Sequence, residues 1–483
     1  MLLDFEPRLQ TFDRHSSFTL PSGFHIASVD EKLQKGPKSD PRPLTLNEGA
    51  QSGKVAPLGV LEHFTGIWVG KGFNTIFRPK NSGSNADAHF DSRTLEFRPA
   101  PFDDNILQLN LTTERLEFTG PIGSVPNRGL ELPKVKGQQE VKGQTDIFLN
   151  GVSYMQTIKD VTNNETGKGD GEATDIHLEP GLWMHIPSTK TPEIGPTLSR
   201  MASIPHGTTI NAQSDPSGVD FFVAKNTELD AVTGKPKIPK ASIAPFGIGS
   251  DPKINFGNIF PSLKIQNNNS PRIPQNLDIF NQAGTIDQAI LDNPNVVLDR
   301  ANNGKKFIKT IEFTVSTTPL RGKDDLVPRQ DAQGNGIANI AFLEGGASEA
   351  STTSTNQRAN ADASKMTSTF YIATVQHQIT VPKWKLGNPT MFISPKGSTP
   401  ADLVPIFSVT PDRDITQPET ITVESTQIQY SQTVLLDFAK LSWPHMSVAT
   451  LIPSPRFINN TQIPENPIVV PASAFQRVSG SRA

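Results

Sequence analysis

Cysteine is absent from the 483 residues of the chain. Disulfide bonds, thiolate metal sites and cysteine nucleophiles are therefore excluded. An excess of charge of one sign is also lacking, because 45 basic and 48 acidic residues leave a formal charge of −3. Without a field of one sign the chain has little to attract a phosphate backbone, so binding to nucleic acid is not expected.

Long hydrophobic runs are missing as well. No stretch reaches the roughly 18 apolar residues that a membrane span requires. Near the start of the chain, Asp4 and Pro7 interrupt the apolar segment that a signal peptide would need. We therefore expect a soluble, cytoplasmic protein with no membrane span.

Proline and glycine are plentiful instead, with 41 and 36 residues, while the hydrophobic fraction is only 35%. Proline interrupts helices, and both residues favour turns, so the composition fits many short strands better than a helical bundle. The length exceeds that at which one hydrophobic core usually keeps growing, which predicts two domains.

Alternating apolar and polar residues predict strands in both halves of the chain. In the first half the runs are 67–71, 94–98, 106–112, 115–119, 145–149, 152–158, 175–178, 181–186, 199–204 and 208–212. In the second half they are 307–316, 337–343, 367–378, 390–393, 406–410, 420–436 and 446–452. Asn150-Gly151 lies between two of these runs and predicts a tight hairpin turn.

The fold expected from this pattern is all-β, with two antiparallel β-barrels joined by an irregular linker. Within the linker, Thr285-Ile-Asp-Gln288 resembles a capping box that opens a short helix through Leu291. The predicted segments are an N-terminal arm (1–55), a first barrel (56–213), the linker (214–304), a second barrel (305–455) and a C-terminal tail (456–483).

A weak internal repeat supports two related halves. Tyr154-Met-Gln-Thr recurs as Tyr430-Ser-Gln-Thr, and Trp183-Met-His185 has a counterpart in the second half in Trp443-Pro-His445. A competing alignment places the segment around His206 against His445, so the duplication stays open.

The sharpest local motif is Gly66-Ile-Trp68-Val-Gly70-Lys-Gly72. On the first strand of a small barrel a tryptophan can plug the closed end, while glycines let the strand coil tightly. These residues would stabilise a barrel whether or not it binds anything. The glycine spacing does not fit a dinucleotide-binding loop.

A Gly-x-Trp strand preceded by a short helical turn resembles the calycin superfamily. The fuller glycine pattern, with segments 116–123, 126–129, 181–183 and 201–208, is similar to nitrobindin-like haem (heme)-binding barrels and to proteins described as peroxidase-like. The resemblance covers about residues 58–213. It implies calycin-like barrels with a cup for a flat apolar ligand such as haem.

The resemblance also implies candidate site residues. His206 matches the late histidine that holds the haem iron in such barrels, His185 is the alternative ligand, and His445 is the counterpart in the second barrel. Trp68 and Tyr154 would line the haem pocket. For each residue the alternative is a structural role in the core.

Three functional hypotheses remain open. The first is a haem-binding barrel, with peroxidase-like or small-gas chemistry at an open iron position. The second is a cofactor-free carrier of a lipid or another small hydrophobic ligand. The third is a structural protein that forms a homo-oligomer through the arm 1–55 and the linker. Catalysis is left open, and so is whether the barrels are hollow, which decides between ligand binding and a scaffold.

Overall fold

The computed structural model describes residues 55–77, 107–129, 143–190, 193–204, 207–214, 225–243, 246–247, 277–317, 336–340, 362–398, 403–438, 441–458, 461–464 and 468–475. These residues all belong to one compact unit, Glu48–Ala483. Of the arm predicted at 1–55, only Val55 lies inside these ranges. No helix of the described ranges is long and apolar enough to cross a membrane.

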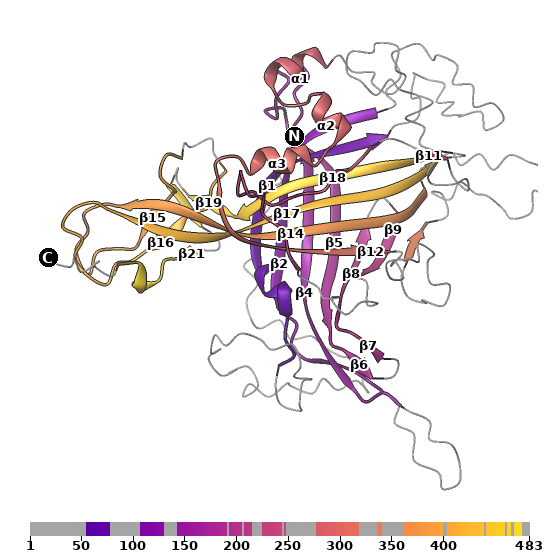
Figure 1. The fold of residues 1–483 in the computed structure, drawn as a ribbon, viewed down its shortest axis with the longest axis horizontal. Coiled ribbons are helices and arrows are strands. Elements are labelled where there is room, and N and C mark those ends of the chain that lie inside the picture. Colours follow the sequence, from indigo (N-terminus) through magenta and orange to yellow (C-terminus); the bar gives the residue numbers. More distant parts are fainter. Residues whose placement is uncertain are drawn as a thin grey trace, which may run out of the picture. The chain divides into compact units, whose positions relative to one another are not determined.

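Ten antiparallel strands close into one barrel (Figure 1). In sheet order, β12 is followed by β14, β17, β18, β1, β2, β4, β5, β8 and β9, and β9 pairs back to β12 through Gln213 and Ser316. The barrel strands are β1 (Gly66–Phe77), β2 (Leu107–Pro121), β4 (Ile147–Asp160), β5 (Thr174–Ile186), β8 (Thr197–Ile204), β9 (Thr208–Gln213), β12 (Lys306–Ser316), β14 (Asp362–Val381), β17 (Glu419–Phe438) and β18 (Leu441–Pro453).

The all-β, antiparallel prediction is confirmed, but the strands do not divide into two barrels. The first half supplies β1 to β9 and the second half β12 to β18, and β1 pairs with β18 from Trp68↔Pro453 to Asn74↔Ser447. Neither set closes on itself, because the edge strands of one half pair with those of the other. Alternation in a sequence locates strands but not their partners, so one shared barrel looked like two.

Several predicted runs are also parts of one longer strand. Most of the run 106–112 and all of 115–119 lie in β2, and most of 145–149 and all of 152–158 lie in β4. The run 94–98 lies outside the described residues. Strands of this length give the barrel interior several levels of side chains.

The hairpin predicted at Asn150-Gly151 is wrong, because β4 runs straight through it. A Cβ atom at Gly151 would lie 2.1 Å from the carbonyl oxygen of Trp183, so glycine is needed where β5 comes close rather than for a turn. The buried Asn150 side chain donates to the carbonyl of Ala56 at 2.5 Å and accepts from Gly123 N at 3.1 Å. The dipeptide therefore fastens the entry segment to the barrel.

Three short helices in the predicted linker cover the outer face of the sheet near β1 and β18 (Figure 1). They are α1 (Asp278–Ala283), α2 (Gln288–Asp292) and α3 (Val296–Ala301). The predicted short helix is confirmed as α2, but its N-cap is Asp287, which accepts from Ile290 N at 3.2 Å, and not Thr285. Phe73 and Leu109 face these helices, which explains why β1 and β2 are buried on both faces.

A lateral extension continues beyond the barrel. The ends of β14 and β17 pair only with each other and pack against a separate small sheet of β15 (Met391–Ile393), β16 (Phe407–Val409) and β21 (Ile468–Val469). Ile379, Trp384 and Phe407 form its core. The predicted tail 456–483 thus contributes β21 and the turn η4 (Ala472–Phe475) to this core.

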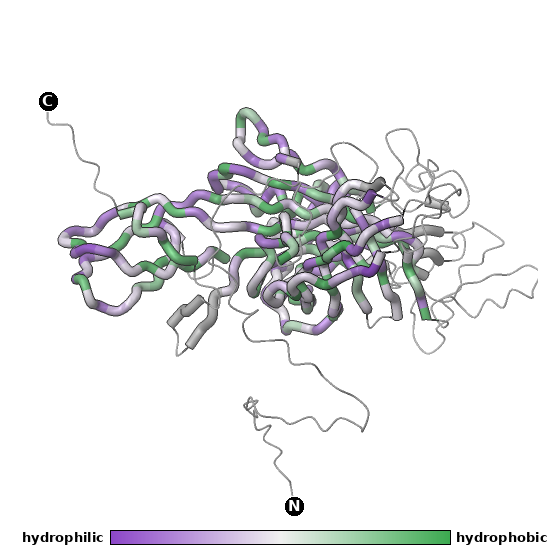
Figure 2. The backbone as a smooth tube through the Cα atoms, turned by 90° about the horizontal axis from the view of Figure 1, so that it is seen from below, coloured by the Kyte–Doolittle hydropathy of each residue, from purple (hydrophilic) through white to green (hydrophobic). Residues whose placement is uncertain are grey.

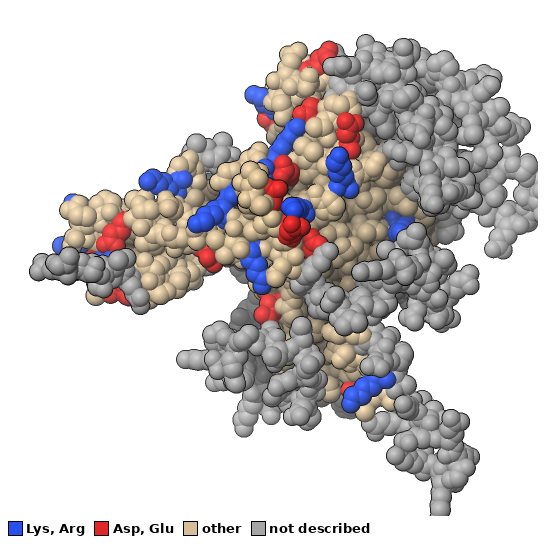
Figure 3. All heavy atoms as spheres, in the orientation of Figure 1, with Lys and Arg blue, Asp and Glu red and all other residues tan. Residues whose placement is uncertain are grey.

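The remaining short strands pair with one another or with one of the barrel strands. They are β3 (Val125–Asn127), β6 (Thr189–Lys190), β7 (Glu193–Ile194), β10 (Lys225–Asn226), β11 (Phe246–Gly247), β13 (Gly336–Asn339), β19 (Pro455–Ile458) and β20 (Thr461–Pro464). Hydropathy changes repeatedly along the barrel strands (Figure 2), and the face in Figure 3 carries basic and acidic side chains interspersed.

One half of the barrel interior is filled with aromatic side chains. The 3-10 turn η2 (Gly59–His63) places Phe64 against the rings of Phe118 and Trp183, with centroids 4.8 and 5.8 Å away. Trp68 is buried in the same cluster, and its indole Nε1 donates to the carbonyl of Phe64 at 2.7 Å. Trp68 therefore sits where a plug was predicted, and this half of the interior is closed by side chains.

We expect Gly72→Ala to lower the free energy of unfolding by about 3 kcal/mol, because overpacking forces backbone to shift. A Cβ atom at Gly72 would lie 2.2 Å from the carbonyl oxygen of Val448 on β18. Gly120→Ala on β2 is the matched control, since a Cβ atom there meets nothing within 4 Å. Urea unfolding monitored by circular dichroism measures both, and equal stabilities would contradict the close approach of β1 and β18.

Candidate functional site

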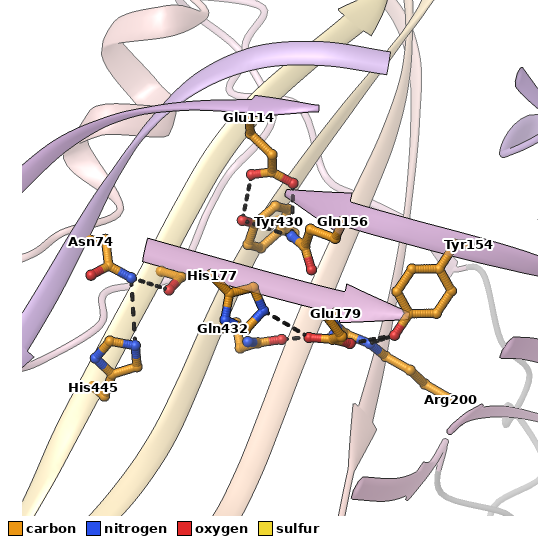
Figure 4. Close-up of polar contacts among 11 residues, drawn as sticks. Asn74, Glu114, Tyr154, Gln156, His177, Glu179, Arg200, Tyr430, Gln432 and His445 are labelled. Carbon is orange, nitrogen blue, oxygen red and sulfur yellow. Dashed lines mark hydrogen bonds and ion pairs between the residues drawn. The ribbon is translucent and has the colours of Figure 1, made fainter. Parts of the chain in front are cut away.

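The other half of the interior carries buried polar side chains from five strands. On β4 and β5, Gln156 lies directly opposite Glu179, and on β5 and β8, Trp183 lies opposite Arg200. We call this set the polar layer; its members, all less than 10% exposed, are Glu114, Tyr154, Gln156, Glu179, Arg200, Tyr430 and Gln432 (Figure 4).

Arg200 lies at the centre of the polar layer. Its guanidinium donates to Glu179 Oε1 at 2.6 Å, to the Tyr154 hydroxyl at 2.9 Å and to Gln432 Oε1 at 2.7 Å. The same group lies 5.7 Å from the ring centre of Trp183, within cation–π range. Arg200 therefore joins the aromatic half of the interior to the polar half.

The pair of Arg200 and Glu179 stays charged. Burial alone would raise the pKa of Glu179, but the charge of Arg200, with hydrogen bonds from His177 and Tyr154, lowers that pKa to about 2. Burial alone would lower the pKa of Arg200, but Glu179 and Tyr154 raise it above its ordinary value. Each charge is thus compensated by the other inside the barrel.

Among the described residues, Glu114 has no cationic side chain in contact with its carboxyl group. Its Oε2 accepts from the Tyr430 hydroxyl at 2.6 Å and its Oε1 accepts from Gln156 Nε2 at 2.7 Å. Burial raises the pKa of Glu114 to about 7, although the hydrogen bonds from Tyr430 and Gln156 act in the opposite direction. This carboxyl group therefore changes its protonation near neutral pH.

His177 connects the polar layer with solvent. Its Nε2 lies 3.1 Å from Glu179 Oε2, and its side chain is 17% exposed, whereas that of Glu179 is fully buried. His177 lies near the first residue of β5, at the end of the barrel away from η2. The polar half of the interior is accordingly the half that reaches the surface.

Three buried polar atoms of the barrel strands have no hydrogen-bond partner among the described residues. They are Asn74 Oδ1, Asn110 Nδ2 and Ser368 Oγ, in side chains that are 5%, 1% and 0% exposed. Asn74 and Asn110 lie opposite each other on β1 and β2. A buried polar group without a partner costs about 1–3 kcal/mol, so each calls for an explanation.

The residues predicted from the sequence are dispersed. Tyr154 belongs to the polar layer, and its hydroxyl donates to Glu179. His185 is buried against Gly59. Burial lowers the pKa of His185, while a hydrogen bond to the backbone carbonyl of Pro57 acts in the opposite direction. His206 lies outside the described residues.

His445 lies at the polar end, where its Nε2 is 3.5 Å from Asn74 Nδ2 (Figure 4). Asn74 Nδ2 also donates to Ser447 Oγ at 2.7 Å. Over the described ranges, no three His, Asp or Glu side chains gather as a metal site.

Sequence reasoning missed the charged members of the polar layer, although a signal was present. Glu114 stands in step with Leu116 and Phe118, and Arg200 stands between Leu198 and Ala202 in the same alternation. The Tyr-x-Gln repeat, a sign of duplicated halves, was a second signal. Both of its copies, Tyr154 with Gln156 and Tyr430 with Gln432, belong to the polar layer.

We expect Arg200→Met to lower the free energy of unfolding by about 3–5 kcal/mol, because it leaves the Glu179 charge buried without compensation. Adding Glu179→Gln should restore much of this loss. Arg128→Ala is the control, because Arg128 is 78% exposed beside Asp146 and should cost less than about 1 kcal/mol. Urea unfolding checks all variants, and additive losses in the double variant would contradict the pairing.

We expect the stability difference between Glu114→Gln and the wild type to depend on pH. The folded-state pKa of Glu114, about 7, exceeds its ordinary value of 4.5, so its stabilising effect is complete below pH 4.5 and is lost as pH rises through 7. Between pH 4 and pH 8 the wild type should lose about 3 kcal/mol relative to the variant. Thermal and urea unfolding at each pH measure this, and a constant difference would count against it.

Comparison with known proteins assigns no family to the chain. No family model matches it, and neither do curated proteins or solved structures. The resemblance to calycins and nitrobindin-like barrels therefore stays a prediction from the sequence.

Proposed function

We propose that the chain is a cofactor-free binding protein for a small organic molecule, held in the polar half of the barrel. The observation that carries this proposal is the pair of buried polar atoms without partners at this end, Asn74 Oδ1 and Asn110 Nδ2. A bound molecule with both donors and acceptors would satisfy them.

A purely structural barrel has little use for such an interior. Apolar side chains fill small barrels at lower cost than buried polar ones, and the aromatic half of this barrel follows that rule with Phe64, Phe118 and Trp183. The polar layer instead departs from it in one region. Departures of this kind concentrate at functional sites.

The arrangement also indicates how a ligand would be held. The aromatic half, closed by η2, would form the floor, and the end near His177 would admit the ligand. Ile158, buried opposite both Glu114 and His177, adds an apolar wall. A small molecule with an apolar body and hydrogen-bonding groups fits these surroundings.

Haem, the cofactor that the sequence resemblance implies, remains an alternative proposal. Trp68, Tyr154 and His185 are each enclosed by packing or hydrogen bonds, which does not support a haem in the aromatic half. His445 is the candidate iron ligand that lies by the polar end. An absorption spectrum after haem addition separates the two, because only haem ligation gives a Soret band that His445→Ala removes.

We expect Asn110→Leu to abolish binding and to stabilise the ligand-free chain by about 1–3 kcal/mol, because it removes a buried donor without a partner. Native mass spectrometry of the purified full-length chain should release an organic compound from the wild type and none from the variant. Thr314→Ala is the matched control, since Thr314 pairs with Thr369 at 2.8 Å on the exposed face of the barrel. A wild type that carries no compound, with a variant that gains no stability, would overturn the proposal.

A further inference from the structure

We infer that the ligand is a small protonated amine whose ammonium group contacts the carboxylate of Glu114. This inference rests on the proposed function and adds the chemical class of the ligand.

The charges of the polar layer do not balance. It contains two carboxyl groups, Glu114 and Glu179, and one guanidinium, Arg200. Arg200 is already bound to Glu179, Tyr154 and Gln432. Within the described ranges, no cationic side chain contacts either oxygen of Glu114. One negative charge therefore lacks a partner when Glu114 is ionised.

The hydrogen bonds at Glu114 suit the ionised form. An amide nitrogen can only donate, so Gln156 Nε2 requires an acceptor at Glu114 Oε1. The Tyr430 hydroxyl donates to Oε2 while it accepts from Gln156 Nε2 at 3.3 Å. Both oxygens thus serve as acceptors, and each keeps a second lone pair for a further donor.

An ammonium group supplies what Glu114 lacks. Burial opposes ionisation of this carboxyl group, and a bound cation with N–H donors would offset that effect through charge-assisted hydrogen bonds. An anionic ligand would meet repulsion from Glu114, because the one guanidinium of the layer is already occupied by Glu179. His177, Glu179, Arg200 and Tyr430 are the other ionisable groups around this position.

The buried atoms without partners point independently to a ligand in this half. Asn110, on the same strand and interior face as Glu114, offers a donor in Nδ2, while Asn74 Oδ1 offers an acceptor. A donor without a partner suits an oxygen of the ligand. An amine that also carries a hydroxyl or carbonyl oxygen therefore matches the site best.

The test compares three probes of similar size at pH 8: 2-phenylethylamine, 2-phenylethanol and 3-phenylpropionate. Isothermal titration calorimetry with the full-length chain should show the amine binding at least about tenfold more tightly than the alcohol, with the carboxylate weakest. Glu114→Gln should remove the preference for the amine and leave the alcohol unchanged. Amine affinity should also fall from pH 8 to pH 6, as Glu114 takes up a proton.

A charge-swap variant guards against a folding defect. Glu114→Gln combined with Gln156→Glu keeps one amide and one carboxylate at these two positions. In the wild type, Gln156 Nε2 and Glu114 Oε1 lie 2.7 Å apart. The double variant should regain the preference for the amine, and circular dichroism confirms that each variant folds.

The outcomes separate this inference from the proposed function. Equal binding of amine and alcohol, with binding of the alcohol lost in Asn110→Leu, would overturn the amine inference and leave the binding function standing. A preference for the amine that survives Glu114→Gln would likewise overturn it. Binding of none of the three probes, with no organic compound released from the purified chain, would overturn both.

Discussion

Closure of the barrel depends on two pairings between distant parts of the chain, β1 with β18 and β9 with β12. Without them the six strands from one half and the four from the other would present open edges. The interior contacts follow from this closure. Tyr430 binds Glu114 across 316 positions of the sequence, and Arg200 binds Gln432 across 232. The polar layer therefore exists only when both halves have folded together.

Within that layer, the same burial has opposite outcomes for two carboxyl groups. Glu179 touches a guanidinium and keeps its charge, with a pKa of about 2. Glu114 touches only neutral donors, and its pKa of about 7 places its proton exchange near neutral pH. Two carboxyl groups whose pKa values are shifted in opposite directions by their surroundings can take different roles. One is a fixed anion, and the other is a group that responds to a partner.

The sequence was informative about strands and poor about their partners. Alternation of apolar and polar residues located most strands of the described ranges, because this pattern is contained in a short stretch of sequence. Pairing depends on contacts far along the chain, so the shared barrel was not predictable. Asn150-Gly151 shows the same limit locally: the turn-forming dipeptide is held in a strand by Trp183 and Ala56, which lie elsewhere in the sequence.

The candidate site was predictable in fragments. Both Tyr-x-Gln segments stand out in the sequence as a repeat and both line the interior, yet nothing local indicates that Tyr430 meets Glu114 rather than Glu179. Glu114 and Arg200 do not stand out in the sequence, because charged residues usually face solvent. Their places in apolar alternation were the available signal. The candidate histidines depend on the family resemblance and not on such patterns.

The length of β14 and β17 helps to fix the register of these strands and therefore which of their side chains face the interior. Both strands serve the barrel and the lateral extension, where Trp384 and Phe407 are locked in a separate core. Since successive residues of a strand face opposite sides, a slip of one position would turn Tyr430 outward and bring Gln429 inside. The extension thus works as an anchor outside the barrel that keeps the alignment of the strands within it.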